Sequence, residues 1–259
     1  MQFAASVVPA VPVRKNPAHE SEMVNQLLFG EVMEVLGTNT DNWCNIKSSF
    51  DGYEGWVHRL QIEAIDNALA TVNSSWIIDA DSVTDIIVSG GIRLNIPYGS
   101  SLLGYKNKQG NFGSFRYEYD GENAFNNKDK KIDSAIILRL IDKWLNTPYL
   151  WGGRTMLGVD CSGLTQMIFK MLGINLLRDA AHQATQGVVV DFLQQAQCGD
   201  LAFFDDEAGA IYHVGILRNN QEIVHASGKV RVDTFDNAGI INRDSGLRTH
   251  KLRIIKRYF

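Results

Sequence analysis

The spacing of apolar residues changes near residue 132 from strand-like to helical, and the change separates an all-β half from a mixed half. Before it, apolar residues alternate in short runs such as 31–36 and 43–46, and turn-forming Gly, Asn and Asp separate the runs. After it, apolar residues at 132–145 recur every three or four positions, as in an amphipathic helix that ends before Pro148. A chain of 259 residues is also longer than most single domains, so we expect several domains.

The first half predicts two stretches of short strands. Residues 1–63 contain so many short apolar runs between turns that a small barrel is expected. A second all-β stretch covers 72–118, and residues 98–102 within it repeat the pattern of residues 29–33. The polar residues 120–131 that follow are typical of a linker.

The second half predicts an α+β domain. After the helix at 132–145, with Asp133 or Ser134 as its N-cap, a second helix fits 162–172 and ends at Gly173. Three strands are then expected, at 201–204, 212–217 and 222–226. Helices followed by antiparallel strands make a domain of the α+β class.

Cys161 stands at the start of the second predicted helix, with Asp160 as a candidate N-cap. The unpaired N–H groups of a helix N-terminus stabilise a thiolate, and a nearby imidazolium lowers the thiol pKa further from about 8.5. We therefore expect Cys161 to be a nucleophile, with a small buried side chain as the alternative. Cys44 and Cys198 are expected to be packed side chains, and no C-x-x-C pair predicts a disulfide framework or a cysteine-rich zinc site.

His213 and His225 lie on two predicted strands that flank the turn-forming residues Asn219 and Asn220. An odd-numbered loop centred on Asn219 would make the histidines a cross-strand pair facing one side, whereas a two-residue loop would put them on opposite faces. In the first case His213 could take the thiol proton while His225 holds its ring. Four other histidines have no companions that suggest ligation: His19, His58, His182 and His250.

Four motifs arrive in an order that resembles the NlpC family of papain-like peptidases, which cut bacterial cell-wall peptides. They are Asp-Cys-Ser-Gly at 160–163, Gly-Asp-Leu-Ala-Phe-Phe at 199–204, His-Val-Gly-Ile at 213–216 and Val-His-Ala-Ser at 224–227. The first half resembles bacterial SH3-like domains, through Gly30 and 55–57, and its second stretch does so more loosely. The resemblance implies SH3-like barrels at 1–66 and 70–120, followed by an α+β papain-like catalytic domain at 132–259.

The family implies catalytic roles for three residues that match its motifs. Cys161 would be the nucleophile, His213 the general base and His225 the third, orienting residue. No cofactor or metal is implied. The open alternatives are a zinc site made of the same three residues and a protein that binds cell wall without catalysis.

The resemblance also implies three substrate-binding residues, and a fourth, Glu54, is suggested by its place just before Gly55 and Trp56 in the first predicted barrel. Tyr149 would lie near the oxyanion and the scissile bond, and a core aromatic is its alternative. Asp160 and Ser162 would bind the free amino end and backbone of the peptide, while Asp160 as a simple N-cap stays open. Glu54 would reach the substrate amine, and a solvated turn carboxylate is its alternative. Ala180 departs from the family pattern, because several relatives carry a serine there that contacts substrate.

The expected reaction is hydrolysis of the γ-D-glutamyl–diamino acid bond of murein peptides through a thioester. The expected substrates are free-amine L-Ala-γ-D-Glu-diaminopimelate peptides in recycling. The alternative is a secreted cell-wall endopeptidase or amidase anchored by its SH3-like domains. A murein-derived peptide is thus the expected partner, and oligomeric state is not indicated.

Charge and hydropathy exclude two partner classes and predict a compartment. A net charge of −4 without a basic stripe gives nucleic-acid binding no electrostatic support. The longest apolar runs, such as 134–138, are too short for a bilayer, so no membrane partner is expected. The N-terminus lacks an early Lys or Arg, and Pro9 and Pro12 interrupt its apolar stretch. We expect a cytoplasmic protein, or a periplasmic or secreted one if a signal peptide was removed.

Overall fold

The computed structural model describes residues 2–71, 76–126 and 132–259. Its contacts divide the chain into two compact units. Unit 1 consists of Met1–Asp129 with Trp151–Met156, and unit 2 consists of Lys130–Leu150 with Leu157–Phe259. Parts of the predicted second all-β stretch and of the predicted linker, at 72–75 and 127–131, lie outside the described residues. The boundaries 1–66, 70–120 and 132–259 stay predictions.

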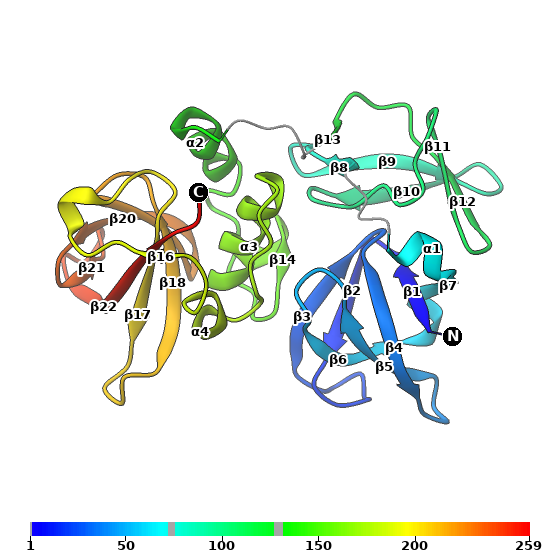
Figure 1. Ribbon diagram of the computed structural model, residues 1–259, viewed down its shortest axis with the longest axis horizontal. Helices are drawn as coiled ribbons and strands as arrows, with labels where there is room; N and C mark the ends of the chain where they lie inside the picture. Colours follow the sequence, from blue (N-terminus) through cyan, green and yellow to red (C-terminus); the bar gives the residue numbers. More distant parts are fainter. Residues whose placement is uncertain (1, 72–75, 127–131) are drawn as a thin grey trace. The chain divides into compact units, whose positions relative to one another are not determined.

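Unit 1 begins with a seven-stranded antiparallel sheet in the order β3-β2-β6-β5-β4-β1-β7 (Figure 1). The strands are β1 (Phe3–Ser6), β2 (Ala10–Arg14), β3 (Met23–Leu28), β4 (Val32–Thr38), β5 (Trp43–Ser48), β6 (Glu54–His58) and β7 (Ile62–Ile65), with η1 (Arg59–Gln61) before β7 and α1 (Asn67–Ala70) after it. The strands predicted at 31–36 and 43–46 are confirmed in β4 and β5. Cys44 is fully buried in this core, as predicted.

The rest of unit 1 is also built of strands. These are β8 (Trp76–Ile78), β9 (Val83–Val88), β10 (Ile92–Pro97), β11 (Gln109–Phe112), β12 (Phe115–Glu118) and β13 (Ala124–Asn126). Four form a sheet in the order β10-β9-β12-β11, and β8 pairs with β13. Gly30 and Gly99 occupy equivalent positions of the predicted repeat, and both have positive φ, 72° and 81°. At Gly30 a Cβ would also lie 1.9 Å from the Ser101 carbonyl oxygen, so only glycine fits.

Unit 2 combines helices with a closed antiparallel sheet. The sheet order is β16-β22-β17-β18-β19-β20-β21, and an additional pairing of β21 with β22 closes the strands from β22 to β21 into a ring, with β16 at its edge. The strands are β16 (Val188–Val189), β17 (Leu201–Asp205), β18 (Ile211–Leu217), β19 (Glu222–Ser227), β20 (Lys229–Asp236), β21 (Gly239–Ile241) and β22 (Arg248–Arg257). The two-residue strand β14 (Arg154–Thr155) belongs to unit 1, and the two-residue strand β15 (Gly158–Val159), in unit 2, precedes the second long helix. The α+β class predicted for this half is confirmed.

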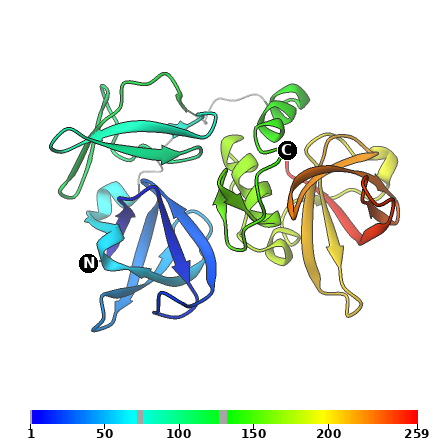
Figure 2. The ribbon, with the colours of Figure 1, turned by 180° about the vertical axis from the view of Figure 1, so that it is seen from behind.

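The helices of unit 2 are α2 (Ser134–Asp142), α3 (Cys161–Met171) and α4 (Ala180–Gln183), and η3 (Leu193–Gln195) is a single 3₁₀ turn. Helix α3 packs against β18, β19 and α2, and Figures 1 and 2 show it beside the sheet from both sides. Every residue of α3 is buried, so its polar side chains need partners: Thr165 Oγ1, for example, donates to Gln183 Oε1 at 2.8 Å. None of the helices in the described residues has the length and hydropathy of a membrane span.

Candidate active site

The N-terminus of α3 positions Cys161. Asp160 has an extended backbone, and its Oδ1 accepts the Gly163 N–H at 2.7 Å, so the predicted N-cap is confirmed. Cys161 is therefore the first residue of the helix, and it is 6% exposed. The backbone N–H groups of Ser162 and Val214 both donate to its sulfur. Since Val214 follows His213 on β18, the sulfur lies beside the strand that carries the predicted base.

The thiol pKa moves opposite to the direction predicted from the helix N-terminus alone. Burial of Cys161 raises the pKa of its thiol to about 12, and the Asp160 carboxylate also raises it. The Val214 and Ser162 N–H groups and the Arg178 guanidinium lower it by less. Desolvation therefore outweighs the favourable dipoles, and the free protein holds a neutral thiol.

His213 and His225 face one side of the β18–β19 hairpin, as predicted. The register pairs Ile216 with Val224 and is centred on Asn220, one residue later than expected. This offset makes the two histidines diagonal neighbours rather than a directly opposed pair. Their rings still meet, because His213 Nε2 and His225 Nδ1 are 2.8 Å apart in a hydrogen bond. No hydrogen bond among the described residues joins the Cys161 sulfur to His213.

The hydrogen-bond chain continues beyond His225 to a carboxylate that sequence reasoning missed. His225 Nε2 lies 3.0 Å from Asp233 Oδ2. Asp233 also accepts from Arg231 Nε at 2.8 Å, from Arg231 Nη2 at 2.9 Å and from the Arg243 N–H at 3.0 Å. Burial alone would raise the pKa of Asp233, but the hydrogen bonds from His225, Arg231 and Arg243 bring it well below its usual range. Asp233 is therefore an ionised carboxylate at neutral pH.

Aromatic rings surround the imidazole of His213. His250, on β22, stacks on it with ring centroids 4.2 Å apart and planes 26° apart. The prediction that His250 has no companions that suggest ligation is wrong, because closure of the sheet brings β22 to this face, beside His213 and His225. Burial lowers the pKa of His213 well below its ordinary value, and His225 and His250 lower it further. His213 is accordingly a neutral imidazole at pH 7, the form that a general base requires.

Three imidazoles could in principle hold a metal ion. His213, His225 and His250 each offer a nitrogen, and the three atoms lie within 4.8 Å of one another; Cys161 does not belong to this set. Two nitrogens bound to a tetrahedral zinc at its usual bond lengths are about 3.3 Å apart. The 2.8 Å between His213 Nε2 and His225 Nδ1 is shorter and is a hydrogen bond. This spacing favours a proton relay over a preformed zinc site.

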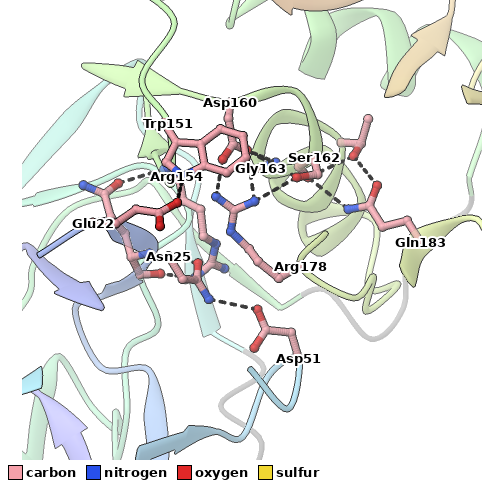
Figure 3. A network of polar contacts seen from close by, with 12 residues as sticks. Glu22, Asn25, Asp51, Trp151, Arg154, Asp160, Ser162, Gly163, Arg178 and Gln183 are labelled. Carbon is pink, nitrogen blue, oxygen red and sulfur yellow. Dashed lines mark hydrogen bonds and ion pairs between the residues drawn. The ribbon is translucent and has the colours of Figure 1, made fainter. Parts of the chain in front are cut away.

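Arg178 organises the residues around the α3 N-terminus (Figure 3). Its Nη2 lies 2.5 Å from Asp160 Oδ2, and its Nη1 donates to Asp160 Oδ1 at 3.0 Å and to Ser162 Oγ at 2.8 Å. All three side chains are buried. Asp160 thus caps the helix and forms an ion pair as well, so the guanidinium balances its charge before any substrate arrives.

Tyr149 and Glu54 have different surroundings. Tyr149 is 38% exposed, so the core-aromatic alternative is wrong. Burial raises the pKa of Tyr149 to about 12, with Cys161 and Asp160 contributing, so its hydroxyl keeps its proton and can donate. Glu54, in unit 1, is 57% exposed and pairs with Lys47 at 3.5 Å. Its role toward a substrate amine stays a prediction.

The segment 151–156 belongs to unit 1 through a buried ion pair that the sequence does not reveal. Arg154 Nη1 and Nη2 contact the two carboxylate oxygens of Glu31 at 2.8 and 3.0 Å, and both side chains are almost fully buried. Arg154 also donates to the Gln26 carbonyl oxygen at 2.6 Å. Trp151 Nε1 donates to Glu22 Oε1 at 2.8 Å, and both of these residues are labelled in Figure 3.

Residues 146–249, which hold Cys161, His213 and His225, match the NlpC/P60 family. This chain is a cysteine peptidase with an NlpC/P60 domain. Residues 13–62 match the bacterial dipeptidyl-peptidase Sh3 domain, which identifies the N-terminal SH3-like domain of this peptidase.

Relatives resemble the peptidase over most of its length. A gamma-D-glutamyl-L-lysine dipeptidyl-peptidase of Bacillus cereus is 24% identical over 89% of this chain and 76% of its own. The Bacillus subtilis protein of that name is 28% identical over 78% and 71%. A crystal structure of an NlpC/P60 family protein from Bacillus cereus covers 99% of both chains with a TM-score of 0.80 at 19% identity, which shows a shared fold.

The neutral thiol predicts how alkylation of Cys161 depends on pH. In a Cys198→Ser variant, in which Cys44 is the only other thiol and is fully buried, iodoacetamide should label Cys161 slowly at pH 7. Because the reacting thiolate forms only as pH approaches the thiol pKa of about 12, the rate should climb about tenfold per pH unit through pH 10. A rate plateau at neutral pH would instead reveal a thiolate–imidazolium ion pair, and the neutral resting state would be wrong.

Proposed function

We propose that this peptidase hydrolyses the γ-D-glutamyl–diamino acid bond of bacterial cell-wall peptides. The observation that carries the proposal is that the nucleophile lies beside the strand of the base, while the base is hydrogen-bonded to a second histidine. The Cys161 sulfur accepts the N–H of Val214, and the adjacent His213 is hydrogen-bonded to His225 at 2.8 Å. The bond specificity is supported by relatives that are named gamma-D-glutamyl-L-lysine dipeptidyl-peptidase and dipeptidyl-peptidase 6.

The proposed reaction is acyl transfer through a thioester. His213 takes the thiol proton as the Cys161 sulfur attacks the γ-carbonyl of D-glutamate, and it then gives that proton to the leaving amine. In the second half His213 takes a proton from water as the water oxygen attacks the thioester carbonyl, and it returns that proton to the departing Cys161 sulfur as the acid is released. Tyr149 keeps its hydroxyl proton and is our proposed donor to the carbonyl oxygen as negative charge develops there.

We assign recognition of the peptide amino end to Asp160 and Ser162, with Glu54 as a further proposed ligand of the amine. Because Arg178 already pairs with Asp160, an incoming ammonium would share that carboxylate rather than neutralise an isolated charge. The proposed setting is recycling of released murein peptides in the cytoplasm. We also propose that the rest of unit 1 forms a second SH3-like barrel and that unit 2 has a papain-like arrangement.

The free tripeptide L-Ala-γ-D-Glu-diaminopimelate should be cut with a kcat/KM at least about a hundredfold above that of its N-acetylmuramyl form. Acylation removes the charge of the amine, so its charge-assisted hydrogen bond to the buried Asp160 is lost, at a cost of about 1.5–3 kcal/mol, and the acyl group adds bulk at that end. Mass spectrometry of the two digests measures the ratio. Glu54→Gln, which changes an exposed side chain, should lower the ratio if Glu54 binds the amine. Similar kcat/KM values on both substrates would favour a secreted wall endopeptidase instead.

A further inference from the structure

We propose that Asp233 is a positioning residue that fixes, through His225, which nitrogen of His213 carries the proton. The proposal rests on the proposed roles of Cys161 and His213, and it adds a fourth residue to their machinery. Asp233 would hold the Nδ1 of His213 free of a proton, so that this nitrogen can accept the proton of the thiol.

The sheet register brings the carboxylate to the far side of His225. Strands β19 and β20 are antiparallel, with Arg231 opposite His225 and Asp233 opposite Ile223. Side chains two residues apart on a strand share a face, so Asp233 is the diagonal neighbour of His225 on that face. His225 and Asp233 are each 1% exposed, and His213 is 6% exposed. Bulk water therefore does not set the protonation of this chain of side chains.

The contacts of Asp233 leave one location for the proton between it and His225. A carboxylate accepts about four hydrogen bonds, two on each oxygen, and donates none when it is ionised. Oδ2 accepts from His225 Nε2 and Arg231 Nε, and Oδ1 accepts from Arg231 Nη2 and the Arg243 N–H. Three of these four donors are a guanidinium or an amide, so the carboxylate stays ionised. The proton of the remaining bond consequently lies on His225 Nε2.

The position of the proton on His225 then determines the position of the proton on His213. Because the guanidinium of Arg231 already balances the charge of Asp233, His225 needs no second proton, and its Nδ1 keeps a lone pair. The 2.8 Å hydrogen bond to His213 therefore requires the proton to be on His213 Nε2. His213 Nδ1 is left with its lone pair, which is the state of a general base. After proton transfer, the imidazolium of His213 keeps the same Nε2–H donation to His225.

Asp233→Asn should move the proton of each histidine to its other ring nitrogen. The amide keeps the size of the carboxylate but replaces one acceptor oxygen with an NH2 group, while Arg231 and Arg243 still require acceptors. An NH2 group facing His225 Nε2 makes that nitrogen an acceptor. The proton then moves to His225 Nδ1 and to His213 Nδ1, where it blocks the base. We expect kcat/KM on the free tripeptide to fall on the order of a hundredfold.

The matched control is Asp244→Asn. Asp244 also pairs with Arg231, at 2.9 Å, but it is 79% exposed and does not contact His225. This variant removes the same charge from the same arginine, and its kcat/KM should stay within about twofold of the parent, because exposed ion pairs contribute little. A loss in Asp244→Asn as large as in Asp233→Asn would assign the effect to Arg231 and overturn the relay.

A double-mutant cycle separates the relay from a purely structural role. In a His225→Asn background, the amide oxygen at position 225 can accept directly from His213 Nε2, so residue 233 no longer sets the tautomer. Asp233→Asn should then cost less than about threefold in kcat/KM, against the hundredfold loss with His225 present. An equal loss in both backgrounds would mean that Asp233 only anchors Arg231 and Arg243.

Nitrogen-15 NMR of histidine-labelled parent protein tests the proton positions without any substrate. We expect neutral His213 and His225 that both carry the proton on Nε2, and a shift of both to Nδ1 in Asp233→Asn. Protonation on His213 Nδ1 in the parent would overturn the proposal, even if the variant failed to fold. Absence of turnover on the tripeptide with the expected tautomers would contradict the proposed substrate alone.

Discussion

Cys161→Ala is expected to lower kcat/KM on the free tripeptide by at least about 10⁴-fold while the protein remains folded. The substitution removes a single sulfur atom, whose polar contacts are the N–H groups of Val214 and Ser162. Asp160, which caps α3, and the buried face of that helix are unchanged. Loss of turnover with an unchanged circular dichroism spectrum and melting temperature would therefore report on chemistry alone.

The matched control for this prediction is Cys198→Ala, since Cys198 is a half-buried thiol whose hydrogen bond, to the Ser134 carbonyl oxygen, lies outside the proposed site. It should retain full activity. His213→Ala should lose about as much as Cys161→Ala, and the double variant should lose little more, because nucleophile and base act as a unit. His225→Ala should lose less, since it orients the base. Activity near the parent level in Cys161→Ala would contradict the assignment of the nucleophile.

Local sequence patterns are enough to predict two parts of this site, the start of α3 and the β18–β19 hairpin. Asp160 and Cys161 are neighbours in sequence, so the cap and the first residue of α3 follow from the onset of helical spacing alone. The β18–β19 hairpin is likewise local, and a turn at Asn219 or Asn220 leaves both histidines on one face. The turn is centred one residue later than predicted, which shifts the register of the two strands by two residues. A two-residue shift makes the histidines diagonal neighbours instead of an opposed pair, but it leaves both on the same face.

Three residues of the site were not predicted: Asp233, His250 and Arg178. Each reaches the site through contacts between elements, which local sequence patterns do not determine. Asp233 reaches His225 only through the register of the next hairpin, and His250 reaches His213 only because β22 pairs with both β17 and β21. Arg178 enters from a segment between helices and pairs with Asp160 across 18 positions of the chain. The thiol pKa was predicted in the wrong direction for a related reason. The helix dipole can be inferred from sequence, whereas the extent of desolvation depends on how every surrounding element packs.

Glu31→Gln is expected to destabilise unit 1 by about 3–5 kcal/mol, because it leaves the guanidinium of Arg154 buried without its counter-charge. Arg154 is 0% exposed and contacts both oxygens of Glu31. Urea unfolding followed by tryptophan fluorescence measures this loss. Four of the five tryptophans belong to unit 1, and Trp144 is the exception. The signal therefore reports mainly on the unit that holds the ion pair.

Two further variants decide whether burial of the pair is the cause. Glu54→Gln removes the same charge from the pair with Lys47, in which both side chains are about half exposed, and it should cost less than about 1 kcal/mol. Glu31→Gln combined with Arg154→Met leaves no unpaired charge, so the double variant should be more stable than either single variant despite carrying two substitutions. If the two losses simply add, the energy lies in the packing and in the Gln26 contacts of Arg154, and the buried ion pair does not hold residues 151–156 in unit 1.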